Sequence, residues 1–464
     1  MSSHHEDISQ VIETTSTKAA KRVWTKSEKR ILLTCLISQF LSNLIASLPA
    51  PFLPSLDESH NIESNITGWI IGLLPLTQLF VCPLYGKLVN YVAVRTMLIT
   101  GLLLCGCFTV LFGMLEYLPL PNPTNGNVDG MYLCLEIVLR IIQSLGAGAI
   151  LVGAMTYLTV TFTDNTMTVL GYAQTACGMG YLIGPGVGSG LFKLGGFVAI
   201  FTAVGGCMIL VGVIAWLILP RDDMAQTEND GSASLRKILF NRNVIASLTL
   251  TAFMGTIWSS IEPILEPELR EKYGLQEEVS ALTFLLVSVT FTVGSPLIAI
   301  ALDKLSWLTS LPLMMCGFLV NFVTFLFMGP CPLFDGFIRP LWLMLVCLTF
   351  MGVGIALGMV PSLHLLSFGN AEKSGKPLGK SAKAILSALW SSAYALGDFI
   401  GPTFSGIMTE YINFAWTMTA YALACLLTAS LISLVQLYNC VKKRKSRKST
   451  ANGIENEETL PLLT

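Results

Sequence analysis

The stretch Gly180-Tyr-Leu-Ile-Gly-Pro-Gly-Val-Gly188 stands inside a long apolar segment, and a near copy, Gly397-Asp-Phe-Ile-Gly-Pro402, stands inside another. The Gly-Pro pairs of the two copies begin at Gly184 and Gly401, 217 positions apart. Other echoes recur at almost the same offset, because the Pro-x-x-Pro of residues 51–54 is answered within residues 263–267. The second half of the chain therefore repeats the first.

The glycines of both copies predict close helix packing. Gly180, Gly184 and Gly188 recur at every fourth position, which leaves a groove without side chains along one helix face. Pro185, and Pro402 in the second copy, interrupt the backbone hydrogen bonds and permit a kink. We expect Gly180, Gly184, Pro185, Gly188, Gly397, Gly401 and Pro402 to form two equivalent seams that close one side of the molecule when it changes state.

The composition indicates a membrane protein. The chain has 464 residues, of which 53% are hydrophobic and only 12% charged, and its mean hydropathy is +0.66. A soluble domain carries about 25% charged residues. The twelve cysteines are scattered and form no Cys-x-x-Cys pair, so we expect neither a metal centre nor a disulfide framework. Residues 1–30 are polar and basic, which argues against a cleaved signal peptide.

Twelve apolar segments have the length of about 20 residues that a membrane-spanning helix needs. They predict an all-α membrane protein with twelve transmembrane helices in two groups of six. Internal repeats of such segments are typical of secondary transporters. The twelve predicted spans are 31–53, 67–89, 95–117, 131–157, 167–191, 197–219, 244–265, 279–302, 308–329, 341–366, 382–407 and 415–439.

The distribution of basic residues predicts the orientation. Twenty-three of the 28 Lys and Arg residues fall in the termini and the alternate loops on their side, and four fall in the opposite loops. Since basic loops stay in the cytoplasm, both termini are expected there. The predicted organisation is a cytoplasmic tail (1–30), a six-helix bundle (31–219), a cytoplasmic linker (220–243), a second six-helix bundle (244–439) and a cytoplasmic tail (440–464).

Ionisable residues inside a membrane span are costly and usually face the interior of the bundle. Glu136 and Arg140 are one turn apart on the fourth span, in the order that favours an ion pair. They are either a self-neutralised pair or a switch in which Arg140 changes partner when a proton or substrate binds. The neighbouring Gln143 and Ser144 favour the switch.

Two further acids stand in the second half. Glu262 precedes Pro263, which breaks the helix and frees backbone carbonyls, an arrangement suited to a cation or proton site. The alternative is that the helix simply ends there and Glu262 is solvated. Asp398 lies within the second Gly-Pro motif with no basic residue within one turn. Such a carboxylate would hold a proton or be neutralised by a cationic substrate. The polar and aromatic residues that we expect to line a cavity with these acids are Gln39, Asn43, Trp258, Ser259, Trp390, Ser391 and Tyr394.

These motifs resemble the major facilitator superfamily over all twelve segments. The run from Arg140 to Ala147 is similar to its Arg-x-x-Gln-Gly-x-Gly-Ala motif, and the run from Gly180 to Ser189 resembles its antiporter motif. Within the superfamily the chain is most similar to the vesicular amine transporters, and especially to the vesicular polyamine transporter branch. That resemblance rests on Leu111 to Glu116, Glu262-Pro263, Gly352 to Met359 and Trp390 to Gly406.

The resemblance implies which residues bind substrate and protons. Glu262 matches the family's acid before proline, and Asn43 matches an asparagine on the first span. Ser42, Pro361 and Ser391 replace aspartates of the monoamine carriers, while Asp398 stands where they have a tyrosine. The negative charge is thus redistributed, and monoamine specificity does not carry over. The substrate and proton site is expected to comprise Glu262, Asp398, Asn43, Tyr394, Glu136 and Arg140.

The C-terminal tail carries an acidic dileucine pattern, Glu458-Thr-Leu-Pro-Leu462-Leu463, which resembles a sorting signal read by clathrin adaptors. It predicts a multi-pass protein of secretory, endosomal or lysosomal vesicles. Asn65 begins a glycosylation sequon at the start of the second span.

The function that these features predict is a proton-coupled antiporter. It would move an organic cation, a polyamine or amine, from the cytoplasm into an acidic vesicle by alternating access. The alternatives are a carrier for an anionic or neutral solute anchored by Arg140, and a membrane receptor that does not transport. We expect no enzyme, no cofactor and no metal site. The expected partners are the organic cation, protons, the lipid bilayer and a clathrin adaptor, with no nucleic acid.

Overall fold

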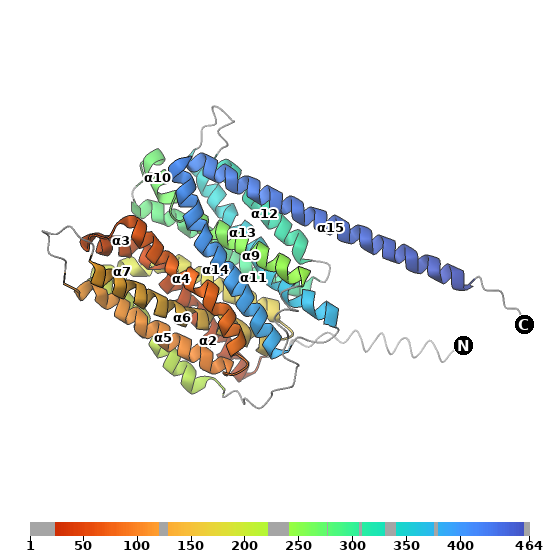
Figure 1. Cartoon of the computed structure of the whole chain (residues 1–464), viewed down its shortest axis with the longest axis horizontal. Coiled ribbons are helices and arrows are strands. Elements are labelled where there is room, and N and C mark those ends of the chain that lie inside the picture. Colours follow the sequence, from red (N-terminus) through yellow and green to blue (C-terminus); the bar gives the residue numbers. More distant parts are fainter. Residues whose placement is uncertain are drawn as a thin grey trace, which may run out of the picture.

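The structure is a computed structural model that describes residues 24–119, 129–220, 241–275, 277–305, 309–329, 340–374 and 379–458. Every element in these ranges is a helix (Figure 1). The helices of the first half are α2 (Lys26–Ser47), α3 (Pro49–Ser59), α4 (Ser64–Leu88), α5 (Val94–Gly113), the 3-10 turn η1 (Met114–Tyr117), α6 (Gly130–Thr161) and α7 (Thr166–Ile218). Those of the second half are α9 (Arg242–Ser260), α10 (Leu265–Tyr273), α11 (Glu277–Lys304), α12 (Ser310–Met328), α13 (Leu341–Ser374), α14 (Lys380–Tyr411) and α15 (Phe414–Glu458).

Each of the twelve predicted spans coincides with helical structure. Among the described residues, ten helical segments are long and apolar enough to cross a membrane. One of them, α7, crosses twice, because its path turns at Gly195 and Gly196. The twelfth crossing is α14, which is less apolar because it carries Lys380, Lys383 and Asp398. The fold is therefore the all-α, twelve-crossing arrangement, and an even number of crossings starts α2 and finishes α15 at the same end of the molecule.

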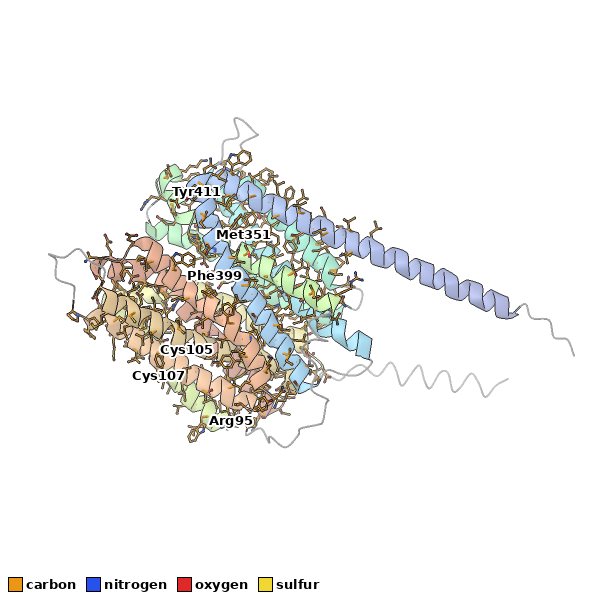
Figure 2. The ribbon with its side chains drawn as sticks, in the orientation of Figure 1. Arg95, Cys105, Cys107, Met351, Phe399 and Tyr411 are labelled. Carbon is orange, nitrogen blue, oxygen red and sulfur yellow. The ribbon has the colours of Figure 1, made fainter. Side chains whose placement is uncertain are left out.

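The helices pack as two six-crossing bundles. The N-terminal bundle comprises α2 to α7 and the C-terminal bundle α9 to α15, and the two meet where α7 packs on α11 and α4 packs on α14 (Figure 1). We call the end where α2, α7 and α14 begin the basic end, since Lys26, Lys29, Lys87, Arg95 and Lys383 gather there. The opposite end carries α3 and α10. Figure 2 marks both ends, with Arg95 near the start of α5 and Tyr411 closing α14.

Local sequence signals explain where several helices begin and turn. Thr25 and Glu28 form a reciprocal capping box at the start of α2. Gly196 has a φ of 69°, a conformation that favours glycine, and lets α7 reverse direction. The carboxylate of Glu116 then accepts the Val198 N–H at 2.8 Å and so caps the second half of α7. Pro263 ends α9, because residues 261–264 form a turn before α10 begins.

The outer surface is apolar. Phe80, Leu84, Trp342 and Leu427 are each more than half exposed, and they stand on three different helices, α4, α13 and α15. Exposed large apolar side chains on all sides of a helical bundle are what a lipid-facing surface requires. The molecule is therefore a multi-pass membrane protein.

Both Gly-Pro motifs pack inside their own bundle. A Cβ on Gly180 would lie 2.5 Å from the Phe40 carbonyl oxygen of α2, and one on Gly397 would collide with the Ala252 carbonyl of α9. The two copies thus join α7 to α2 and α14 to α9 in equivalent positions. The glycines of the two copies thus pack within a bundle, whereas Phe399 of the second copy contacts Trp69 of α4 in the other bundle, with ring centroids 6.1 Å apart. The part of both copies in gating stays a prediction.

At the basic end the two bundles are tied together by hydrogen bonds. The Lys383 ammonium donates to the Thr159 carbonyl at 2.9 Å at this end, and the Ser392 hydroxyl, farther along α14 toward the middle of the molecule, donates to the Leu79 carbonyl at 2.6 Å. Both bonds link α14 to the N-terminal bundle. The basic end is therefore closed in this structure.

Several sequence predictions lie outside the described residues. These are the first 23 residues of the N-terminal tail, most of the linker (221–240), and Leu462 and Leu463 of the dileucine pattern. Glu458 is the last residue of α15.

Candidate functional site

A cavity lies on the boundary between the bundles, about halfway along the helices. Its volume is about 50 Å³, which is enough for a few water molecules. Eight helices contribute to it. Its wall consists of Gln39, Ser42, Asn43 and Ala46 of α2; Leu74 and Gln78 of α4; Leu151 of α6; Gln174, Cys177, Gly178 and Tyr181 of α7; Trp258 of α9; Phe291 of α11; Met359 of α13; and Trp390, Tyr394 and Asp398 of α14.

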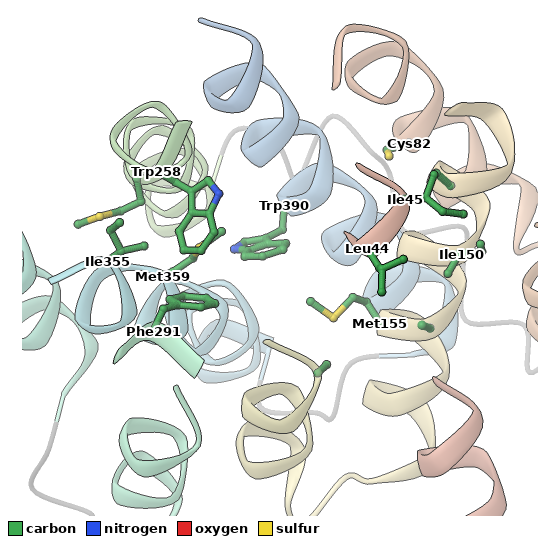
Figure 3. Packing of buried hydrophobic residues seen from close by; sticks show 14 of the residues in the cluster. Leu44, Ile45, Cys82, Ile150, Met155, Trp258, Phe291, Ile355, Met359 and Trp390 are labelled. Atoms are coloured by element: carbon green, nitrogen blue, oxygen red, sulfur yellow. The ribbon is translucent and has the colours of Figure 1, made fainter. Parts of the chain in front are cut away.

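The cavity wall contains five aromatic rings, and Figure 3 shows Trp258, Phe291 and Trp390 among them. The Trp258 ring stands edge-on to Tyr181, with centroids 5.5 Å apart, and edge-on to Phe291, with centroids 5.0 Å apart. The rings of Trp390 and Tyr394 are almost parallel, at 6.1 Å and 9°. Aromatic faces attract cations, so the wall suits a positively charged guest.

Asp398 is the one acid in the cavity wall among the described residues, and no Lys, Arg or His stands beside it in that wall. Its helix, α14, begins at Lys380, which places the carboxylate toward the opposite end. The side chain is partly exposed. The cavity therefore carries a negative charge that only a proton or a cationic guest would neutralise.

Two amide side chains of α2 add polar contacts. Asn43 donates to the Gln39 carbonyl at 2.7 Å, one turn back. The Gln39 side chain is completely buried, and neither its oxygen nor its nitrogen has a hydrogen-bond partner among the residues that the structure describes. Leaving a buried polar group unpaired costs about 1–3 kcal/mol. Gln39 thus presents a free donor and a free acceptor to whatever occupies the cavity.

Glu262 lies near the cavity but outside its wall. It sits in the turn between α9 and α10 and is exposed. Its carboxylate repels that of Asp398 and acts electrostatically on Tyr181 and Tyr394, so it faces the same space from the opposite end. Of the two readings open from the sequence, the helix does end at Glu262, and the carboxylate remains within reach of the cavity.

Glu136 and Arg140 are completely buried inside the N-terminal bundle and do not line the cavity. Arg140 donates to the Gln143 side chain at 2.7 Å and lies over the Phe112 ring at 5.8 Å. Both carboxylate oxygens of Glu136 lack a hydrogen-bond partner. The two side chains attract each other without a hydrogen bond, and the exchange of partners by Arg140 stays a prediction.

The structure separates the cavity residues expected from sequence into two groups. Gln39, Asn43, Trp258, Trp390, Tyr394 and Asp398 line the cavity. Ser259 and Ser391 instead donate back to their own helices, to Gly255 and Ser387. Sequence reasoning missed Gln174, Cys177, Tyr181 and Phe291. Tyr181 could have been found, because it directly follows Gly180 in the first Gly-Pro motif.

Within the described ranges, no three His, Cys, Asp or Glu side chains gather in a way that could hold a metal ion. The chemistry available at the cavity is therefore ionic attraction, hydrogen bonding, cation–π contact and proton exchange.

Comparison with known proteins shows which proteins the chain resembles. It is 26% identical to the human MFS-type transporter SLC18B1 over 443 residues, which cover 94% of this chain and 92% of that protein. It is 24% identical to the human synaptic vesicular amine transporter over 381 residues, covering 82% of this chain and 68% of that one. The crystal structure of the human organic anion transporter MFSD10 (TETRAN) shares the fold, with a TM-score of 0.67 and 15% identity over 88% of this chain and 100% of that one.

These relatives are transporters rather than enzymes. The sequence profile described as Major Facilitator Superfamily matches residues 35–379, about three quarters of the chain, and so the protein belongs to the Major Facilitator Superfamily.

Proposed function

We propose that the protein is a proton-coupled antiporter that exchanges protons for an organic amine, with polyamines as the preferred class. The observation that carries this proposal is the cavity wall. It combines the Asp398 carboxylate with five aromatic rings and contains no basic side chain among the described residues. The likeness to the synaptic vesicular amine transporter supports the amine class.

The exchange follows from competition for one carboxylate. A cation in the cavity neutralises Asp398 and gains contact with the rings of Trp258 and Trp390. A proton on the same carboxylate removes that attraction and releases the cation. Because the bundles meet along α7 with α11 and α4 with α14, tilting at these two contacts would expose the cavity to each end in turn.

The proposed orientation places the basic end in the cytoplasm, as the bias of Lys and Arg toward the termini indicates. The opposite end, which carries Glu262, then faces the vesicle lumen. In this state the cytoplasmic side is closed and Glu262 is exposed on the luminal side. Protons from an acidic lumen would therefore reach the cavity from the Glu262 side. The dileucine pattern of the tail supports delivery to such vesicles by a clathrin adaptor.

The position of Arg140 argues against a carrier for anions. Its guanidinium is fully buried, bonded to Gln143 and outside the cavity wall. An anionic substrate in the cavity would meet Asp398 instead.

The test is uptake by the purified protein in proteoliposomes with an imposed pH gradient, acidic inside. Spermine, spermidine, serotonin and acetylcholine form the substrate panel. At least one amine should accumulate only with the gradient, and Asp398→Asn should reduce that uptake by at least roughly tenfold. Glu410→Gln is the matched control, since Glu410 is an exposed acid on the same helix. If the uptake of every amine in the panel is independent of the pH gradient, the protein is not a proton-coupled antiporter of these amines.

A further inference from the structure

Outside the cavity, side chains of α4 and α6 meet Asp57 of α3 at the opposite end. Asp57 of α3 is completely buried. It accepts a hydrogen bond from the Thr67 hydroxyl of α4 at 2.6 Å and one from the Tyr132 hydroxyl of α6 at 3.1 Å. His60, which follows α3 and is 1% exposed, acts on the same carboxylate electrostatically.

The cluster reaches solvent through Asp129. The His60 ring stacks on the Tyr132 ring, with centroids 3.9 Å apart and planes 13° from parallel. Its Nδ1 atom lies 3.2 Å from the Asp129 carboxylate, whose side chain is 15% exposed. The other ring nitrogen of His60 is buried and has no hydrogen-bond partner. From the surface inward the order is thus Asp129, His60, Tyr132 and Asp57.

Glu136 continues this series toward the middle of the membrane. It stands one turn after Tyr132 on α6, is completely buried, and has no hydrogen-bond partner on either oxygen. The charges that act on it are Asp57 of α3 on one side and Arg140 of α6 on the other, and it acts in turn on Tyr132. A buried carboxylate without hydrogen bonds is costly as an anion, and holding a proton removes that cost.

Arg140 connects this series to the cavity. It interacts electrostatically with Tyr181, which stands in the cavity wall. It also donates to Gln143, which donates in turn to the Thr109 hydroxyl at 2.7 Å. A change of charge at Glu136 would therefore be felt at the cavity through one intervening side chain.

We propose that Asp57, His60 and Glu136 form a second proton site, separate from the cavity carboxylates, through which protons enter from the opposite end and come to rest on Glu136. A proton arriving beside Asp129 is taken up by the unpartnered nitrogen of His60 or by Asp57 and passes to Glu136. When the Glu136 proton is later released on the other side of the membrane, each carrier returns to its starting state. The proposal rests on the proposed proton-coupled function.

The competing explanation is that the cluster only fastens α3 and α4 to α6. Two transport modes separate the explanations. Uptake driven by a pH gradient needs net proton movement, whereas the exchange of labelled for unlabelled amine at equal pH does not. A proton carrier is needed for the first mode alone, and a structural fastener is needed for both.

The experiment measures both modes with full-length protein in proteoliposomes. Asp57→Asn and Glu136→Gln should each reduce gradient-driven uptake at least roughly tenfold while amine exchange stays near the wild-type rate. Glu58→Gln is the matched control, because Glu58 is the exposed neighbour of Asp57 on the same helix, and it should change neither mode.

Two results would overturn the proposal. If uptake and exchange fall together in the variants, the cluster is structural. If both modes stay at wild-type rates, Glu136 carries no proton that transport needs. Failure of the proposed function would look different, because wild-type uptake itself would then ignore the pH gradient.

Discussion

The Asp303 carboxylate at the end of α11 accepts two hydrogen bonds from Thr168, one from the backbone N–H at 2.7 Å and one from the hydroxyl at 2.6 Å. Thr168 lies in the first turn of α7, where backbone N–H groups have no partner within the helix. Asp303 thus caps a helix of the other bundle. The cap works only while the basic end is closed, since the two bundles must be in contact there.

Removing this cap should favour opening at the basic end. Hydrogen bonds to a charged group contribute about 1.5–3 kcal/mol, so Asp303→Asn should raise the open population roughly tenfold or more. The measurement is the distance distribution between spin labels at Thr163 and Lys380, two exposed positions on opposite sides of the boundary. Lys304→Gln, beside Asp303, is the control. An unchanged distribution in Asp303→Asn would show that the cap does not hold this end closed.

The glycines of the Gly-Pro motif provide a stability test. Gly180→Ala should destabilise the protein by about 1–3 kcal/mol, because the added Cβ would lie 2.5 Å from a backbone oxygen of α2 that cannot move alone. Gly186→Ala is the matched control, since no atom lies within 4 Å of its added Cβ. The readout is the thermal unfolding temperature in detergent. Equal losses in both variants would contradict the packing role of Gly180.

The unpaired amide of Gln39 should contribute to binding of the transported amine while lowering the stability of the folded protein. Gln39→Leu removes a buried donor and acceptor that have no partner in the described part of the chain, so the unfolding temperature should stay equal or rise. Affinity for the transported amine should fall roughly tenfold, since a hydrogen bond to a charged guest contributes about 1.5–3 kcal/mol. Titration calorimetry and thermal unfolding check the two parts. A lower unfolding temperature together with unchanged affinity would show that Gln39 has a structural role only.

Glu262 should determine whether the protein prefers amines with several positive charges over amines with one. Asp398 offers one negative charge inside the cavity, and Glu262 faces the same space from outside the wall. Glu262→Gln should therefore lower the affinity for spermine and spermidine by roughly tenfold. The affinity for serotonin, which carries a single charge, should change little. Competition against a labelled polyamine measures the ratio. Equal weakening of amines with one and several charges would place Glu262 in a different role.

The sequence predicted the spans well because a run of about 20 apolar residues reflects contact with lipid, which depends little on the neighbouring helices. It also predicted the break at Pro263, a local effect of the missing N–H. Asp398 and Tyr394 were found because each is a polar group at an unusual depth in a span, and the structure places both in the cavity wall.

The relationships that the sequence did not reveal join residues far apart in the chain. Asp57 and Tyr132 meet across 75 positions, and Thr168 and Asp303 across 135. No helical spacing records such contacts. Glu136 and Arg140 show that spacing is also limited within one helix. Their spacing favours an ion pair, yet the hydrogen bond of Arg140 goes to Gln143, about one turn further along. Spacing shows which side chains share a face and leaves open which partner each one takes.

Asp129 gives a prediction about pH. The Tyr132 backbone N–H donates to its carboxylate at the start of α6 and, with help from His60, holds the pKa of Asp129 below its ordinary value. A carboxyl whose pKa is lowered by folding stabilises the protein above its unfolded pKa, about 4, and loses that contribution as pH falls through the folded value. Asp129→Asn keeps a side chain that can cap α6 but removes the charge, whereas Asp129→Ala also removes the cap and should cost about 1 kcal/mol.

The unfolding temperature of wild type should therefore exceed that of Asp129→Asn at neutral pH, and the difference should shrink below about pH 4, where the wild-type carboxyl takes up its proton. Glu58→Gln, an exposed acid at the same end, should show no such difference at either pH. Two results would contradict this prediction: equal unfolding temperatures of wild type and Asp129→Asn at neutral pH, or a difference between them that grows below pH 4. Either result would mean that the charge of Asp129 does not stabilise this end of α6. The link from solvent to His60 would then have to be sought in another side chain.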